Sequence, residues 1–300
     1  MQRHPSTSKM RVKSTLTPDM RYHRNLLDLD VLLRQGVGRN TATKKAKVFA
    51  NENEVAPTLF IIDWDDTLNP STWCMRRGLP LFRDLSDEDK STFRDLEAKV
   101  ARTMLKCIDT GFLVIVTNAE NGWVEQSSKL LMPEVWKLLH RIPVISARSS
   151  FEHSCRDAPI AWKSMTFAKI MSELITSSSI SLGQPLRVVS IGDSNHEREA
   201  LFEVSRERMP RIVPVSVKLM NMPNIHDLST QHDHLHLQLD NILSGNAPRD
   251  IYYKDGFFVD FPARSPAEIR PPSIQRRSVP RKLVTAQVPS RPPPHPRLRT

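Results

Sequence analysis

Short apolar runs alternate along the central part of the chain with longer segments whose apolar residues recur at helical spacing. A continuous apolar run such as 58–62 is typical of a strand that is buried on both faces of a parallel sheet. Further runs of this kind predict strands at 112–117, 143–146, 187–191 and 212–219. The segments between them predict helices from Ser86 to Gly111, at 122–140, at 163–176, from near Ser194 and at 226–244. This alternation predicts an α/β fold, a Rossmann-like three-layer parallel sheet with helices on both faces.

The two ends of the chain differ in composition from this central part. Residues 1–55 are basic and show little periodicity beyond a leucine-rich stretch at 26–33, so we expect them to be mostly disordered. Residues 248–300 are rich in proline and arginine and are expected to form a mostly disordered tail. The folded domain is therefore predicted to span 56–247. Whether the aromatic residues of 246–262 pack on this domain or bind a partner stays open.

The formal net charge of +10 is distributed unevenly. Residues 1–56 hold 11 Lys and Arg against 5 acids, and residues 263–300 hold 9 against 1, so the ends carry +14 together and residues 57–262 carry −4. A domain that reads nucleic-acid sequence usually carries the positive face itself, so this charge distribution disfavours such a fold. The basic ends leave open an acidic or nucleic-acid partner, although solubilising arms are the simpler interpretation.

Cysteine usage and hydropathy indicate an intracellular protein. Cys74, Cys107 and Cys155 lie far apart and lack the spacing of a zinc site or a disulfide framework, which fits a reducing compartment. No apolar run approaches the roughly 18 residues of a transmembrane helix, so no transmembrane segment is predicted. The basic clusters at 44–47 and 276–282 are candidate nuclear-entry signals, which leaves cytoplasm and nucleus both open.

The first predicted strand runs directly into two carboxylates, Asp63 and Asp65. Paired carboxylates beside a buried strand are unfavourable unless a cation compensates them. Because their oxygens are hard ligands, Mg²⁺ is favoured over zinc. Thr117 and Asp193 follow two other predicted strands. The carboxyl ends of parallel strands lie along one edge of a sheet, where ligands bind, so we expect these side chains to converge there.

Four segments of the chain, within about 58–200, resemble in order the motifs of the haloacid dehalogenase (HAD) superfamily. These motifs are an apolar strand followed by DxDxT, a Thr or Ser ending the next strand, a Lys at the start of a helix, and a strand ending in GDxxxD. The matching residues are Asp63, Asp65 and Thr67, then Thr117 with Asn118, then Lys163, and finally Asp193 with Glu197, where Glu takes the last acidic place.

The resemblance implies phosphohydrolase chemistry. Asp63 would attack phosphorus and form an aspartyl-phosphate. Asp65 would protonate the leaving oxygen and then deprotonate the attacking water. An acid at this second position favours a phosphatase, because the ATPase branch of the superfamily generally has Thr there and the dehalogenases lack the acid. The resemblance also implies a Mg²⁺ ion held by Asp63, by the backbone carbonyl of Asp65 and by Asp193.

The remaining matched residues would bind the phosphoryl group or support the site. Thr117, Asn118 and Lys163 would contact the non-bridging oxygens, where charge develops in the transition state. Thr67 would fix the backbone after the first strand. Glu197 would bind Lys163 or a metal-bound water.

The family's cap domains are inserted after the first motif or between the second and third. Here the gaps 68–111 and 118–162 leave no room for a folded cap, which predicts an open site. An open site suits a substrate whose own bulk closes it, so a phosphorylated macromolecule is expected, with protein favoured. Two alternatives stay open. One is a small-molecule or nucleotide phosphatase capped by the chain's ends or a partner subunit, and the other is a non-enzymatic interaction protein built on a HAD-like domain.

Overall fold

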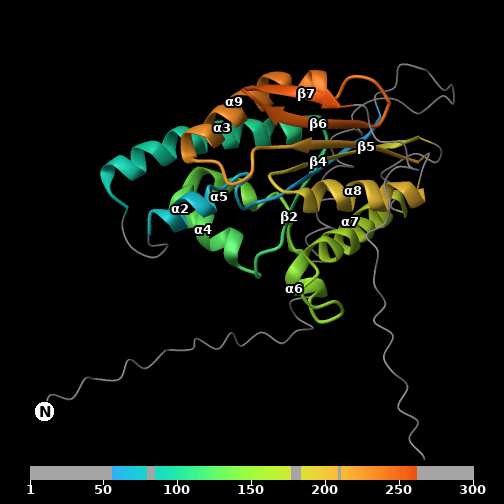
Figure 1. Cartoon of the computed structure of the whole chain (residues 1–300), viewed down its shortest axis with the longest axis horizontal. Helices are drawn as coiled ribbons and strands as arrows, with labels where there is room; N and C mark the ends of the chain where they lie inside the picture. Colours follow the sequence, from blue (N-terminus) through green and yellow to red (C-terminus); the bar gives the residue numbers. More distant parts are fainter. Residues whose placement is uncertain (1–55, 80–84, 177–183, 209–210, 262–300) are drawn as a thin grey trace, which may run out of the picture. The chain divides into compact units, whose positions relative to one another are not determined.

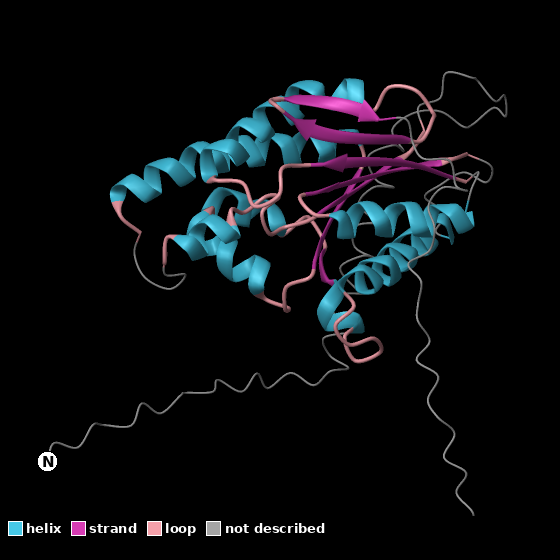
Figure 2. Ribbon diagram, in the orientation of Figure 1, coloured by secondary structure: helices cyan, strands magenta, loops and turns pink. Residues whose placement is uncertain are grey.

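A seven-stranded sheet organises the part of the chain that the structure, a computed structural model, describes: residues 56–79, 85–176, 184–208 and 211–261. The sheet is mostly parallel and helices cover it, which confirms the predicted α/β class (Figures 1 and 2). The basic ends and the leucine-rich stretch at 26–33 lie outside the described residues.

The strands follow the order β3-β2-β1-β4-β5-β6-β7, with every neighbouring pair parallel except β6 and β7. In the centre, β1 and β4 are buried along their whole length, because each has a strand on both sides and helices on both faces. The strands are β1 (Thr58–Ile62), β2 (Phe112–Thr117), β3 (Val144–Ser146), β4 (Leu186–Gly192), β5 (Ile212–Lys218), β6 (Arg249–Lys254) and β7 (Phe257–Phe261).

Helices form a layer on each face of the sheet. Figure 1 shows α3 and α9 on one side of the sheet and α7 and α8 on the other. Successive side chains of a strand point to opposite faces, so Phe60 and Ile62 pack with α3, α5 and α9, whereas Leu59 and Ile61 pack with α7 and α8. The helices are α2 (Ser71–Arg76), α3 (Asp87–Thr110), α4 (Trp123–Leu131), α5 (Pro133–Leu139), α6 (Ala147–Phe151), α7 (Pro159–Thr176), α8 (Asn195–Arg208) and α9 (Ile225–Ile242). Among the described residues, none of these helices combines the length and apolar character needed to cross a bilayer.

The single helix predicted over 122–140 is wrong in one respect, because the structure divides it into α4 and α5. Pro133 has no N–H for the helical hydrogen bond and its ring clashes with the preceding turn, so α4 ends at Leu131 and Pro133 opens a new helix. The buried carboxylate of Glu97 accepts from the N–H groups of Glu134 (2.5 Å) and Val135 (3.2 Å) at this new start. A side chain of α3 therefore satisfies the free N–H groups at the start of α5.

Two strands beyond the predicted domain boundary at residue 247 also belong to the sheet. Asp255 and Gly256 both have positive φ, 52° and 86°, and connect β6 to β7 in a two-residue hairpin. An Asp-Gly pair between β-forming residues is a strong hairpin signal, so this element was visible in the sequence. Residues 249–261, which the sequence placed in the tail, therefore extend the sheet.

Candidate active site

The strand order reverses direction at β1 and β4, and in open α/β sheets the carboxyl ends of two such strands form the ligand-binding crevice. From β1 the chain builds the sheet outward through β2 and β3, then crosses to the other side of β1 and continues with β4. Open α/β sheets bind ligands at such a switch point. Asp63 directly follows β1 and Asp193 directly follows β4, and the Asp63 N–H donates to the Ile191 carbonyl at 3.0 Å. Both carboxylates therefore stand at this crevice.

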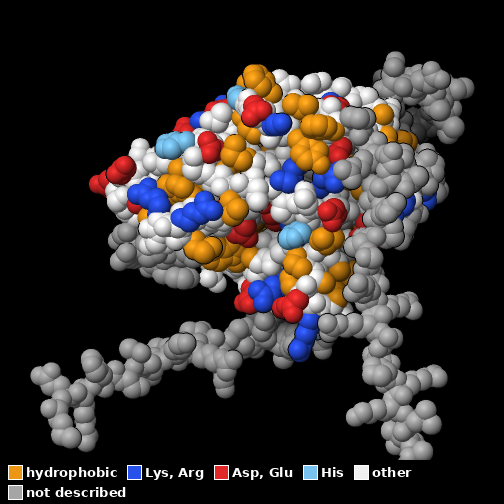
Figure 3. All heavy atoms as spheres, viewed as in Figure 1, with side chains coloured by type: hydrophobic (Ala, Val, Ile, Leu, Met, Phe, Trp, Pro, Cys, Tyr) orange, Lys and Arg blue, Asp and Glu red, His pale blue; other side chains and the backbone are white. Residues whose placement is uncertain are grey.

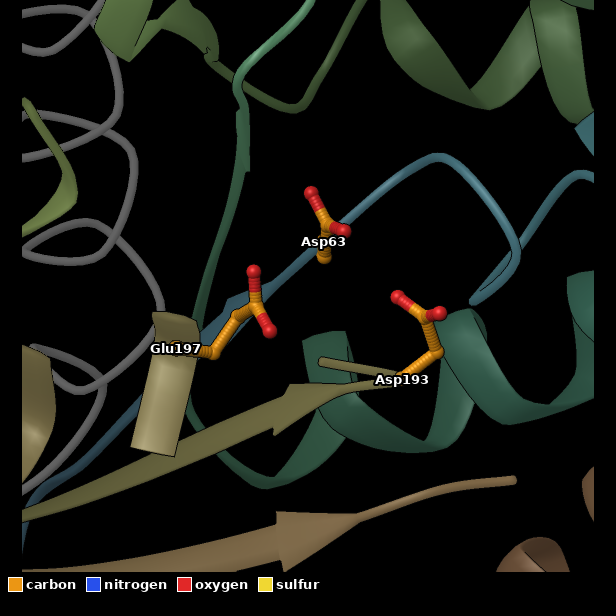
Figure 4. Close-up of side chains that lie close together, drawn as sticks. All are labelled: Asp63, Asp193 and Glu197. Carbon is orange, nitrogen blue, oxygen red and sulfur yellow. The ribbon is translucent and has the colours of Figure 1, made fainter. Parts of the chain in front are cut away.

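Three buried carboxylates meet here, from Asp63, Asp193 and Glu197 in the first turn of α8 (Figure 4). One oxygen of each lies within 4.8 Å of the others. The Lys163 ammonium, from α7, contacts Asp63 Oδ1 at 2.8 Å and donates to Glu197 Oε1. Lys163 is 1% exposed, so these contacts are shielded from water. The lysine of the third motif thus lies inside the cluster.

Burial and mutual repulsion perturb these groups. Burial raises the pKa of Asp63 well above its usual range, against the opposing effect of Lys163. Burial alone would lower the pKa of Lys163, but the Asp63 and Glu197 carboxylates raise it. For Glu197, Lys163 outweighs burial and lowers the pKa. Burial, then Glu197 and Asp66, raise the pKa of Asp193 to about 7. The Lys218 ammonium, which donates to the Asp193 carbonyl, acts in the opposite direction on Asp193. Two ammonium groups therefore stand against three carboxylates.

The Asp65 carboxylate is held on both oxygens. Its Oδ1 accepts from the Ser71 hydroxyl and, at 2.7 Å, from the Trp123 indole N–H, while its Oδ2 accepts from the Thr117 hydroxyl at 3.2 Å. Ser71 opens α2 and Trp123 opens α4, so two short helices orient one carboxylate. Neither Ser71 nor Trp123 could be predicted as a site residue, because neither belongs to a motif and their contact with Asp65 depends on tertiary packing.

Thr67 and Asp66 fix the loop that follows β1. The Thr67 hydroxyl accepts from the Asp193 N–H at 3.0 Å, which ties the loops after β1 and β4 together. The Thr67 carbonyl lies 2.9 Å from Nε2 of His232, a buried residue of α9 that no motif indicated. Asp66 has a φ of 54° and its carboxylate accepts from the N–H (2.8 Å) and the hydroxyl of Thr72. Both residues are therefore structural parts of the loop.

The loop after β2 approaches the start of α7. Thr117 Oγ1 accepts from the Ala119 N–H at 2.9 Å, and Asn118 donates from its amide to the Pro159 carbonyl at 3.4 Å. The buried amide oxygen of Asn118 has no hydrogen-bond partner within the described part of the chain. Pro159 is the first residue of the helix that carries Lys163. Thr117, Asn118 and Lys163 thus belong to two connected elements.

A divalent cation fits this donor set. Mg²⁺ takes oxygen ligands at about 2.1 Å, so ligand oxygens around it lie up to about 4 Å apart, close to the spacing of the cluster. Both Glu197 oxygens are engaged, Oε1 by Lys163 and Oε2 by the N–H (3.2 Å) and hydroxyl (2.6 Å) of Ser194. Because both side-chain oxygens of Asp65 are occupied too, the carboxylates best suited to a metal are Asp63 and Asp193.

Searches with this chain found no matching protein-family model, no similar curated protein and no similar solved structure. The site must therefore be interpreted from its own geometry.

Proposed function

We propose that this chain is a Mg²⁺-dependent phosphatase of the HAD type, which cleaves phosphomonoesters through an aspartyl-phosphate on Asp63. The observation that supports this most is the pairing of Asp63 with Lys163 at 2.8 Å, at the switch point of the sheet and beside the anchored Asp65 carboxylate. A nucleophilic carboxylate, an acid–base group and a fixed positive charge are the parts that phosphoryl transfer requires.

In the first step, a carboxylate oxygen of Asp63 forms a bond to phosphorus as the bond from phosphorus to the ester oxygen breaks. Protonated Asp65 gives its proton to that leaving oxygen. In the second step, Asp65 takes a proton from water, the water oxygen bonds to phosphorus, and the acyl phosphate bond breaks to restore Asp63. Ser71 and Trp123 keep the Asp65 carboxylate in place during both proton transfers.

Lys163 and Thr117 bind the non-bridging phosphoryl oxygens. The Lys163 ammonium contacts the Asp63 carboxylate, so its positive charge lies next to the oxygen that would bond to phosphorus. Glu197 keeps Lys163 oriented and charged. Mg²⁺, held by Asp63, Asp193 and the Asp65 carbonyl, would offset the negative charge of the phosphoryl group and of the carboxylates. Asn118, whose amide oxygen lacks a partner among the described residues, is the proposed third ligand of the phosphoryl group.

A phosphorylated macromolecule is the proposed substrate class, with protein favoured. The described residues of the two insertion points form only short helices, α2 after β1 and α4 to α6 after β2, together with the core helix α3 and the strand β3. Without a closing domain, the substrate itself must exclude water from the crevice. A folded or extended protein segment has the bulk to do so.

The first test is hydrolysis of an aryl phosphate by the purified full chain, with and without Mg²⁺. We expect metal-dependent turnover that Asp63→Asn lowers by a hundredfold or more, since such groups contribute at least that much to rate. Asp109→Asn, which removes an exposed carboxylate of α3, is the matched control and should retain turnover. A folded protein without Mg²⁺-dependent turnover on aryl phosphates or phosphopeptides would contradict the proposal.

Metal binding can be measured separately from turnover. Mg²⁺ that binds only the folded chain raises the melting temperature in proportion to the logarithm of its concentration. We expect this shift in the wild type and in Asp109→Asn, and its loss in Asp193→Asn. An equal shift in all three proteins would mean that Mg²⁺ binds elsewhere.

A further inference from the structure

Two segments contact both the site and each other: helix α2 and the connection from β5 to α9 at 219–224. The Met222 N–H donates to the Asp193 carboxylate, and the φ of Met222 is 48°, a left-handed value that is uncommon for a residue with a side chain. The backbone of Met222 is therefore held next to Asp193. The Met222 sulfur accepts from Arg76 Nη2 at 3.5 Å. Since α2 begins at Ser71, a partner of Asp65, the Arg76 contact joins the two sides of the crevice.

The Arg76 guanidinium carries a charge that the described residues do not neutralise. Arg76 is exposed, and among these residues no carboxylate forms an ion pair with it, whereas the adjacent Arg77 pairs with Asp89 at 3.1 Å. A thioether is a weak acceptor and carries no charge, so Met222 orients the guanidinium without compensating it. Arg76 is thus positioned to form a bidentate pair with a carboxylate from outside the chain.

Three exposed methionines belong to the two segments that Arg76 and Met222 connect. Met75, Met220 and Met222 are 74%, 39% and 46% exposed, and all three belong to the same two segments. Basic and hydrophobic side chains lie side by side on this face, over α2 and α4 (Figure 3). Methionine is flexible and polarizable, so exposed methionines suit surfaces that accommodate apolar side chains of varied shape.

We propose that Arg76 and these three methionines form a recognition rim for the residues next to the phosphorylated side chain of a protein substrate. Arg76 pairs with an acidic side chain, and the methionines pack on an apolar one. This inference rests on the proposed phosphatase function. A nucleic acid fits the rim less well, because residues 57–262 have a net charge of −4 and the guanidinium of Arg76 matches one carboxylate rather than a polyanion.

The test uses two phosphopeptides that differ only in one flanking residue, Glu or Gln. For the wild-type chain we expect kcat/KM to favour the Glu peptide about tenfold, the effect of one charge-assisted hydrogen-bond pair. Arg76→Gln should reduce this ratio to near one. Arg77→Gln, which removes the neighbouring arginine, should leave the ratio unchanged.

Binding of the same labelled peptides to Asp63→Asn protein, followed by fluorescence anisotropy, gives the preference without turnover. If the wild type hydrolyses aryl phosphate but Arg76→Gln still prefers the Glu peptide in both turnover and binding, the proposed role of the rim is wrong. The phosphatase function then stands. If no substrate is turned over but binding still depends on Arg76 and Glu, the phosphatase function fails and the rim stands. Stronger Arg76-dependent binding of a 5′-phosphorylated oligonucleotide would overturn the assignment to protein.

Discussion

The Glu197 side chain packs against the backbone of Gly192 so closely that no Cβ fits between them. A Cβ on Gly192 would lie 2.5 Å from Glu197 Cγ and 2.7 Å from its Oε2. We therefore expect Gly192→Ala to displace Glu197 and to weaken its contact with Lys163. Because Lys163 also holds Asp63, turnover of aryl phosphate should fall at least tenfold, together with a loss of about 1–3 kcal/mol in the free energy of unfolding.

Gly111→Ala is the matched control for this substitution. A Cβ there would lie 2.2 Å from the Thr58 carbonyl, at the end of β1 opposite to the site. It should lower stability by overpacking without changing the rate per folded molecule. If both variants lose activity only in proportion to their loss of folded protein, Gly192 has no special relation to the site.

The indole of Trp123 should matter for the rate because it orients Asp65. Trp123→Phe keeps the aromatic packing but removes the N–H that lies 2.7 Å from Asp65 Oδ1. The loss of one charge-assisted hydrogen bond corresponds to roughly tenfold in kcat. Trp136→Phe, which changes a tryptophan that packs edge-to-face against His140, is the control and should keep the wild-type kcat. Equal kcat values for all three proteins would show that Ser71 and Thr117 suffice to hold Asp65.

The sequence predicted the strands that carry the site because their physical signal is strong. Strands such as β1 and β4 are buried on both faces, so they consist of continuous apolar runs, and the acids that follow them interrupt the pattern sharply. The parallel alternation then brought Asp63, Thr117 and Asp193 to one edge. Lys163 was the least secure match, since one lysine on a helix usually faces solvent, yet it is buried among the carboxylates.

Other parts of the site could not be predicted, since they depend on packing between distant elements. His232 and Trp123 look like ordinary helix residues in the sequence, and only the tertiary structure brings them to Thr67 and Asp65. The hairpin of β6 and β7 was missed for a related reason. Its Asp255-Gly256 turn is a local signal, but whether the aromatic residues around this turn pack on the domain or bind a partner depends on tertiary packing.

Asp250 of that hairpin should be important for stability. Its buried carboxylate accepts from Arg198 Nε at 3.0 Å and Nη2 at 2.5 Å, which ties α8, the helix of Glu197, to β6. Asp250→Asn leaves a largely buried guanidinium without its counter-charge, so we expect a loss of about 3 kcal/mol in urea unfolding at neutral pH. Asp260→Asn breaks the more exposed pair with Arg249 and should cost about 1 kcal/mol or less. Similar losses in both variants would contradict this view of the α8–β6 contact.

His232 predicts how stability depends on pH. The Thr67 carbonyl can only accept, so Nε2 of His232 carries the proton, and burial lowers the pKa of the ring from 6.5 to about 4. As pH falls from about 6.5 towards 4, His232 binds a proton in the unfolded chain but stays neutral in the folded chain. The folded state should therefore lose up to about 3 kcal/mol from this group over that range.

Other groups titrate in the same range, so the contribution of His232 is measured as a difference. His232→Gln replaces the ring with an amide that does not ionise, and its free energy of unfolding should fall less steeply between pH 6.5 and 4 than that of the wild type. His140→Gln, which changes a more exposed histidine, should follow the wild-type slope. If His232→Gln and the wild type share one slope in urea titrations, the ring is protonated in the folded state, and the hydrogen bond to Thr67 does not depend on a neutral histidine.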